Sequence, residues 1–220
     1  MVRVRTLVLL TTLAALCAVL AAGLVLFGGR TFGRSSELPV IGQAPPWKLT
    51  DQLGRTVSST DLRGKVWVAN FVYTSCTDTC PALSLKMQLL QNQLRGHGLL
   101  GRGVELVSFT TDPKRDTPEV LRRYSRQHGA EPDSWHFLTG TEAEMRAVIV
   151  KGFMLGLEDA PQAEATPHDH AADEHHDEGY QVIHSNRFVL VDQQGRIRAY
   201  LDGTGLSAEE LTKEVMRLVK

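Results

Sequence analysis

The chain has 220 residues and a formal net charge of −1 at pH 7, with 42% hydrophobic and 22% charged residues. This balance is typical of a globular protein and excludes general disorder. A near-neutral charge without a basic stripe argues against nucleic-acid binding. Three cysteines are too few for a small scaffold held together by disulfides.

Residues 6–29 carry no charged side chain. As a helix this run would be about 36 Å long, enough to cross a hydrocarbon core of about 30 Å. Arg3 and Arg5 precede it, as expected for a cytoplasmic N-terminus over residues 1–5. We therefore expect a single transmembrane anchor at 6–29, with a cleaved signal peptide as the alternative. Either interpretation places the rest of the chain outside the cytoplasm, and the short leader favours a bacterial inner membrane with the domain in the periplasm.

The segment that follows the anchor is polar, and we interpret residues 30–40 as a tether to a folded domain over residues 41–220. Turn-forming residues within 49–64 predict a short hairpin followed by a loop. Val66–Tyr73 is a continuous apolar and β-branched run, which predicts a strand buried on both faces.

A helix with apolar residues at spacings of three and four follows this strand, with Pro81 in its first turn and Gly96 near its end. Val104–Phe109 predicts a second buried strand, and Thr117 is an N-cap for the next helix. Further strands are predicted at 135–138, 187–192 and 196–201, and further helices at 141–150 and 207–218. This alternation predicts an α/β fold with a central sheet flanked by helices. A cysteine pair at the end of the first core strand makes it thioredoxin-like.

Cys76 and Cys80 are that pair. Their spacing of four predicts that both lie on the same face at the start of a helix, with Cβ atoms about 5–6 Å apart. A helix N-terminus stabilises anions, so we expect the pKa of both thiols to be depressed. The spacing leaves three hypotheses open. In the first, the two cysteines bind a metal as thiolates, which are soft ligands that favour Cu(I). In the second, they form a reversible disulfide. In the third, they are inert core residues.

His184 is the candidate third ligand of a metal site. It lies just before the predicted strand at 187–192, and in thioredoxin-like folds the loop before that strand approaches the helix that carries the cysteines. An imidazole there would complete a site of two sulfur atoms and one nitrogen. The alternative is a polar residue at a strand end, hydrogen-bonded to the backbone.

The segment 158–178 holds eight acidic residues and four histidines, with no Lys or Arg. Such a composition cannot bury a core, so we expect a loop inserted into the domain. Imidazole and carboxylate ligands suit Cu(II), Ni(II) or Zn(II). The segment is either a solvated insertion or a weak auxiliary metal site.

Residues of about 40–215 resemble the SCO/SenC family of membrane-anchored copper chaperones of cytochrome c oxidase assembly. Three motifs carry the resemblance: Cys76-x-x-x-Cys80-Pro81 after a buried strand, the stretch Thr111-Asp112-Pro113-Lys114-Arg115-Asp116-Thr117-Pro118, and His184 before a strand. The resemblance implies a thioredoxin-like fold and copper bound by Cys76, Cys80 and His184. It also implies delivery to the dinuclear copper centre of the oxidase.

The resemblance implies partners as well: the copper-binding subunit of the oxidase and, as further candidates, other periplasmic copper chaperones. A copper carrier would not be an enzyme. The enzymatic alternative is a thiol:disulfide oxidoreductase that keeps the copper-ligand cysteines of the oxidase reduced.

Three positions lie within these motifs, and of them only Thr77 departs from the family pattern. Thr77 stands where the family often has proline. We interpret Asp78 as a helix-start charge, with modulation of metal or partner binding as the alternative. Asp112 follows the second core strand and starts a turn, with orientation of the site or the partner as its alternative role.

Overall fold

The computed structural model describes residues 37–77, 79–155 and 185–219. Residues 38–220 form one compact unit. The predicted anchor at 6–29, Asp78, the acidic segment at 158–178 and His184 lie outside the described residues. Within the described ranges, none of the helices combines the length and the apolar character that a membrane span requires.

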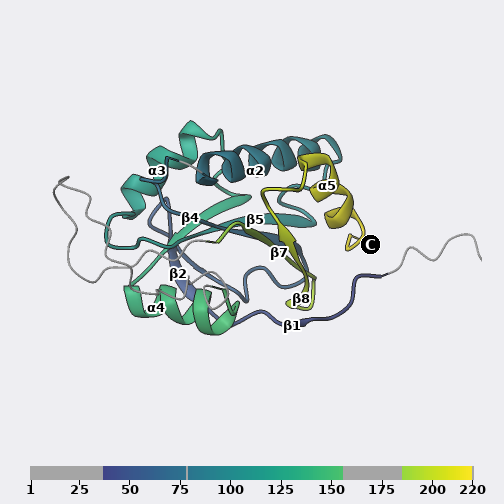
Figure 1. Ribbon diagram of the computed structural model, residues 1–220, viewed down its shortest axis with the longest axis horizontal. Helices are drawn as coiled ribbons and strands as arrows, with labels where there is room; N and C mark the ends of the chain where they lie inside the picture. The colour runs from purple at the N-terminus through teal and green to yellow at the C-terminus, as the bar shows by residue number, and fades with distance from the viewer. Residues whose placement is uncertain (1–36, 78, 156–184, 220) are drawn as a thin grey trace, which may run out of the picture. The chain divides into compact units, whose positions relative to one another are not determined.

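Eight strands form one mixed sheet in the order β1-β8-β7-β4-β5-β6-β2-β3 (Figure 1). The strands are β1 Gly42–Gln43, β2 Lys48–Asp51, β3 Thr56–Ser58, β4 Val66–Val72, β5 Val104–Thr110, β6 Trp135–Thr139, β7 Arg187–Val191 and β8 Arg196–Asp202. The neighbours β4, β5 and β6 are parallel to one another, and the other pairs are antiparallel. The predicted central mixed sheet is confirmed, as is the hairpin, which is formed by β2 and β3.

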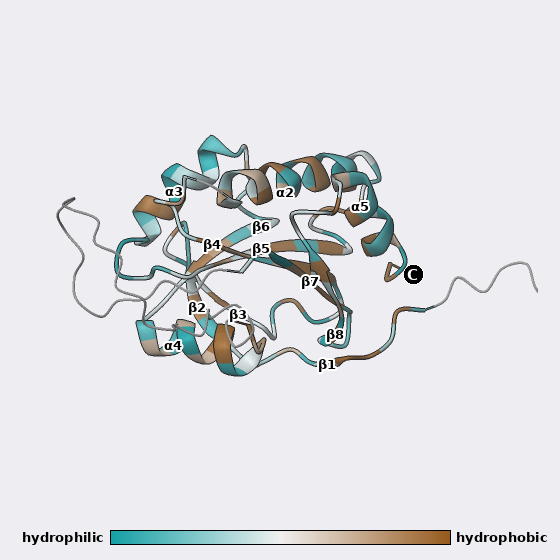
Figure 2. Cartoon of the chain, viewed as in Figure 1, coloured by the Kyte–Doolittle hydropathy of each residue, from teal (hydrophilic) through white to brown (hydrophobic). Residues whose placement is uncertain are grey.

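The two central strands, β4 and β5, are buried along their whole length. Because successive side chains of a strand point to opposite faces, each strand supplies both layers of the core. From β4, Val68 packs on one face and Trp67 and Phe71 pack on the other. Figure 2 shows hydrophobic residues concentrated along these strands. The continuous apolar run in the sequence therefore reflects a strand covered from both sides.

Helices cover the two faces of the sheet unequally. The first core layer packs under α2 Thr79–Gly96, α3 Pro118–Gln127 and α5 Ala208–Met216. The second packs under α4 Glu142–Arg146 and the π-helical turn η1 Ala147–Gly152. Figure 1 shows α2, α3 and α5 on one side of the sheet and α4 on the other. This is the arrangement of helices around a sheet that the alternation of elements predicts.

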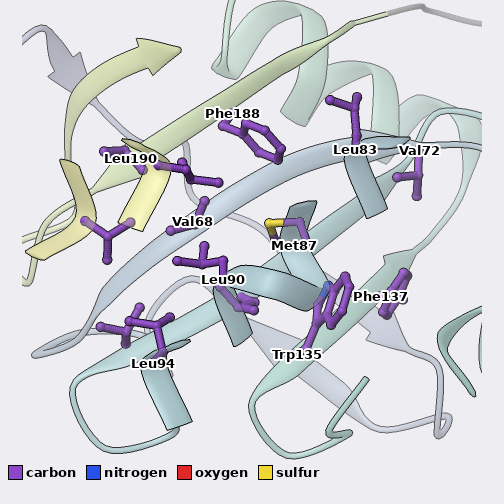
Figure 3. Close-up of a cluster of buried hydrophobic side chains, with 14 of the residues drawn as sticks. Val68, Val72, Leu83, Met87, Leu90, Leu94, Trp135, Phe137, Phe188 and Leu190 are labelled. Atoms are coloured by element: carbon purple, nitrogen blue, oxygen red, sulfur yellow. The ribbon is translucent and has the colours of Figure 1, made fainter. Parts of the chain in front are cut away.

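The helix that carries the second cysteine is held by the first core layer. Leu83, Met87, Leu90 and Leu94 recur at spacings of three and four along α2 and are all buried. In Figure 3 these side chains face Val68 of β4, Trp135 and Phe137 of β6, and Phe188 and Leu190 of β7. The core therefore fixes the position of α2 on the sheet.

Local signals in the sequence set most element boundaries. Thr117 caps α3 by accepting a hydrogen bond from the backbone N–H of Val120, and Pro118 follows it in the first turn, as predicted. Ser207 caps α5 and exchanges hydrogen bonds with Glu210. The helix predicted at 141–150 changes to π-helical geometry at Ala147. No prediction covered β1, because its two residues are defined only by pairing with Ile197 and Arg196 of β8.

Candidate functional site

The loop between β4 and α2 carries the first cysteine. The backbone N–H of Cys76 donates to the carbonyl of Tyr73 at 3.1 Å, which closes a turn directly after β4. Helix α2 begins only at Thr79, so Cys80 lies in its first turn and Cys76 lies before it. The prediction that both cysteines share one helix face is wrong for Cys76, because the turn at the strand end delays the start of the helix.

The two sulfur atoms nevertheless meet. Both residues are thiols, and a side-chain hydrogen bond joins Cys80 to Cys76. Both are buried, with 8% of Cys76 and 5% of Cys80 exposed, and both belong to the core layer under α2. The structure thus brings the predicted sulfur pair together beside the C-terminal end of the central strand β4.

Burial governs the acidity of the second thiol. It raises the pKa of Cys80 to about 12, the hydrogen bond with the Tyr73 backbone lowers that pKa, and Cys76 and the negative charge of Asp116 raise it further. The predicted depression of the thiol pKa is therefore wrong for Cys80. Removing the sulfur from water disfavours the thiolate more than the helix N-terminus favours it.

Asp116 is a residue of this site that the sequence analysis did not single out. It is 1% exposed and accepts hydrogen bonds from the Thr74 N–H at 3.1 Å, the Thr74 hydroxyl at 2.5 Å and the Thr110 hydroxyl at 2.6 Å. Burial raises the pKa of Asp116, and these hydrogen bonds lower it. A signal for it existed, since Asp116 belongs to one of the three motifs.

Tyr124 of α3 is a second neighbour of the sulfur pair. Its hydroxyl shares a hydrogen bond of 2.8 Å with Ser84, one turn after Cys80 on α2. Burial raises the pKa of Tyr124 to about 12, and both thiols add to the shift. The hydroxyl of this buried side chain therefore lies near the sulfur pair.

Asp112 forms a turn, as predicted. Its carboxylate accepts hydrogen bonds from the backbone N–H of Arg115 at 3.3 Å and from the Arg115 guanidinium at 3.1 Å. Its own N–H donates to the hydroxyl of Thr110 at 3.0 Å. These hydrogen bonds to neighbouring residues of the same loop account for the burial of Asp112.

The entry to β7 lies beside the helix that carries Cys80. A methyl group added at Gly203 would meet both the carbonyl oxygen of Asn186 and the side chain of Leu83 at 2.4 Å. Lys86 of α2 also donates to the carbonyl of Gly203 at 2.5 Å. The residue just before β7 and the N-terminal half of α2 therefore pack against the same glycine.

His184 lies outside the described residues, two positions before Asn186. Within the part of the chain that the structure describes, no group of three or more His, Cys, Asp or Glu side chains is arranged to hold a metal ion. Of the three predicted ligands, the structure therefore describes the two cysteines.

A family model described as SCO1/SenC matches residues 39–220 of this chain. The chain belongs to the SCO1/SenC family. A SCO1 protein homolog of Bacillus subtilis is 30% identical over 180 residues, which cover 81% of this chain and 83% of the relative.

Two solved structures of the family bear on the site. BsSco, described as a member of the Sco family of cytochrome c oxidase assembly proteins with a disulfide switch, is 27% identical. It has a TM-score of 0.62, with 81% of this chain and 95% of that chain covered. Yeast Sco1 with copper bound is 26% identical with a TM-score of 0.61, and 80% of this chain and 87% of that chain are covered. The fold is therefore the thioredoxin-like fold of the Sco proteins.

Proposed function

We propose that this protein is a copper chaperone that holds copper through Cys76, Cys80 and His184 and delivers it to the dinuclear copper centre of cytochrome c oxidase. The observation that carries the proposal is the contact between two buried thiols at the start of α2. Thiolates are soft ligands that select Cu(I) over hard cations. The bound copper of yeast Sco1, a family member, supports the same cargo here.

The packing around Gly203 supports His184 as the third ligand. Asn186, two positions after His184 in the sequence, packs beside α2 at Gly203. A site of three ligands suits transfer, because a ligand of the partner can enter before one of the chaperone leaves. The thiolate ligands favour Cu(I), and an imidazole ligand also suits Cu(II).

The variant His184→Ala tests the proposal in the full chain in detergent. We expect Cu(I) affinity, measured by competition with a chelator, to fall more than about tenfold, because even outer-shell partners of a metal contribute that much. The matched control is His97→Ala, since His97 is exposed. Unchanged affinity in His184→Ala would contradict the three-ligand site.

A second function rests on the same contact between the thiols. Cys76 and Cys80 are close enough to exchange with a disulfide, so the protein would reduce the copper-ligand cysteines of the oxidase. His184→Ala separates the two functions, because it removes a copper ligand and leaves both thiols. If cells with His184→Ala still assemble active oxidase, thiol reduction is the function. If oxidase assembly fails in His184→Ala while the two thiols still form their disulfide, copper delivery is the function.

We further propose that residues 6–29 anchor the chain in a bacterial inner membrane, with the domain at 41–220 in the periplasm. The support is the uncharged run of the sequence, which is long enough to span a bilayer. Carbonate extraction of membranes tests the anchor: the intact chain is expected in the pellet, and its release as a soluble protein would contradict it.

A further inference from the structure

The loop that carries Cys76 is attached to the rest of the domain through Thr74. Both the N–H and the hydroxyl of Thr74 donate to the carboxylate of Asp116, at 3.1 and 2.5 Å. Cys76 follows two residues later, inside the turn closed by its hydrogen bond to Tyr73. Asp116 belongs to the loop between β5 and α3, so this contact joins two loops that are far apart in the sequence.

Asp116 is itself held rigidly. The hydroxyl of Thr110 donates to it at 2.6 Å, and its backbone N–H donates to the carbonyl of Asp112 at 2.9 Å. The same Thr110 hydroxyl accepts from the N–H of Asp112 at 3.0 Å. Buried polar networks in which the partners are satisfied are rigid, so Asp116 is a fixed point for the Cys76 loop.

The two cysteines depend on different supports. Cys80 is part of α2, which the core holds through Leu83 and Met87. Cys76 is buried in the same core layer but precedes the helix, so its backbone is positioned by the loop before α2. A metal site or a disulfide needs a defined distance between the two sulfur atoms, and that distance therefore depends on how the loop before α2 is held.

We propose that Asp116 is a positioning residue that fixes the Cys76 loop through Thr74 and thereby holds the two sulfur atoms at the spacing that copper binding requires. The copper part rests on the proposed function. The positioning itself applies equally to the dithiol without metal.

The test uses Asp116→Asn and Thr74→Val, which remove the carboxylate and the hydroxyl, and Thr74→Ser, which keeps the hydroxyl. The probe is the equilibrium of the metal-free protein with glutathione. One oxidised glutathione gives two reduced molecules as the Cys76–Cys80 bond forms, and the two thiol protons pass to the glutathione sulfurs. We expect the equilibrium constant for disulfide formation to fall severalfold in Asp116→Asn and Thr74→Val, because loosely held thiols meet less often, and to be retained in Thr74→Ser.

Asp192→Asn is the matched control. Asp192 is also 1% exposed and accepts several hydrogen bonds, including one from Arg198 at 2.8 Å, but it follows β7 at the opposite end of the sheet from the thiols. It should lower stability without changing the glutathione equilibrium. If Asp116→Asn does not fold, Thr74→Val decides. Glutathione equilibria equal to the wild type in the variants that fold would overturn the inference.

Copper provides a second measurement. We expect Cu(I) affinity to fall on the order of 10- to 100-fold in Asp116→Asn, as for other outer-shell partners. The decrease in Cu(I) affinity for Thr74→Val should lie at the lower end of this range, because the backbone N–H at this position still donates to Asp116. If the wild type itself does not bind Cu(I), the proposed function fails, while the glutathione equilibrium still decides the role of Asp116.

Discussion

The thiol of Cys80 lies in the first turn of α2 with 5% of the residue exposed, and burial raises its pKa to about 12. At neutral pH this group therefore holds its proton in the metal-free protein. In the proposed site copper binds the thiolate of Cys80, so binding has to displace that proton. The same burial that keeps the thiol protonated also shields the sulfur from water.

This displacement predicts a pH dependence of copper binding. Because the pKa of Cys80 lies far above neutrality, at least one proton is released per Cu(I) between pH 6 and 8, and the affinity rises by about tenfold per pH unit for each proton. Chelator competition at several pH values measures this slope, and pH indicators measure the released protons. A slope of zero would mean that Cys80 is already ionised or does not bind copper.

At the scale of the elements, the contact of α2 with the ends of β7 and β8 depends on Gly203. A methyl group there would overlap Leu83 and the carbonyl of Asn186, so Gly203→Ala should destabilise the fold by about 1–3 kcal/mol. It should also weaken Cu(I) binding, because it pushes the entry to β7 away from α2. Urea unfolding and chelator competition measure the two effects.

Gly205→Ala is the control for this contact. A methyl group at Gly205 would approach Asp202 at 3.4 Å, which is ordinary van der Waals contact. The two glycines lie in the same segment after β8, so equal unfolding midpoints for the two variants would show that close packing at Gly203 does not matter.

At the scale of the whole molecule, the site belongs to a unit that begins at Leu38. Arg198 of β8 donates to the carbonyl of Pro39 at 3.1 Å and also to that of Leu38, so the chain joins the domain soon after the proposed anchor. Replacing residues 1–29 by a cleavable signal peptide should give a soluble periplasmic protein with unchanged Cu(I) affinity. Oxidase assembly should decrease, because the carrier is no longer held at the membrane.

Cell fractionation, copper titration and oxidase activity measure these three effects. A replaced leader that leaves oxidase assembly unchanged would show that anchoring is not needed for delivery.

Local patterns in the sequence determined most of the fold and part of the site. The buried runs at Val66–Val72 and Val104–Thr110, the cap at Thr117 and the cysteine pair are written in neighbouring residues, because hydrophobic periodicity and capping act over a few positions. The tertiary structure alone decided that Cys76 precedes the helix, that Cys80 is too buried to ionise easily, and that Asp116 holds Thr74. Burial and hydrogen bonds between distant loops depend on how the elements pack, which no local pattern encodes.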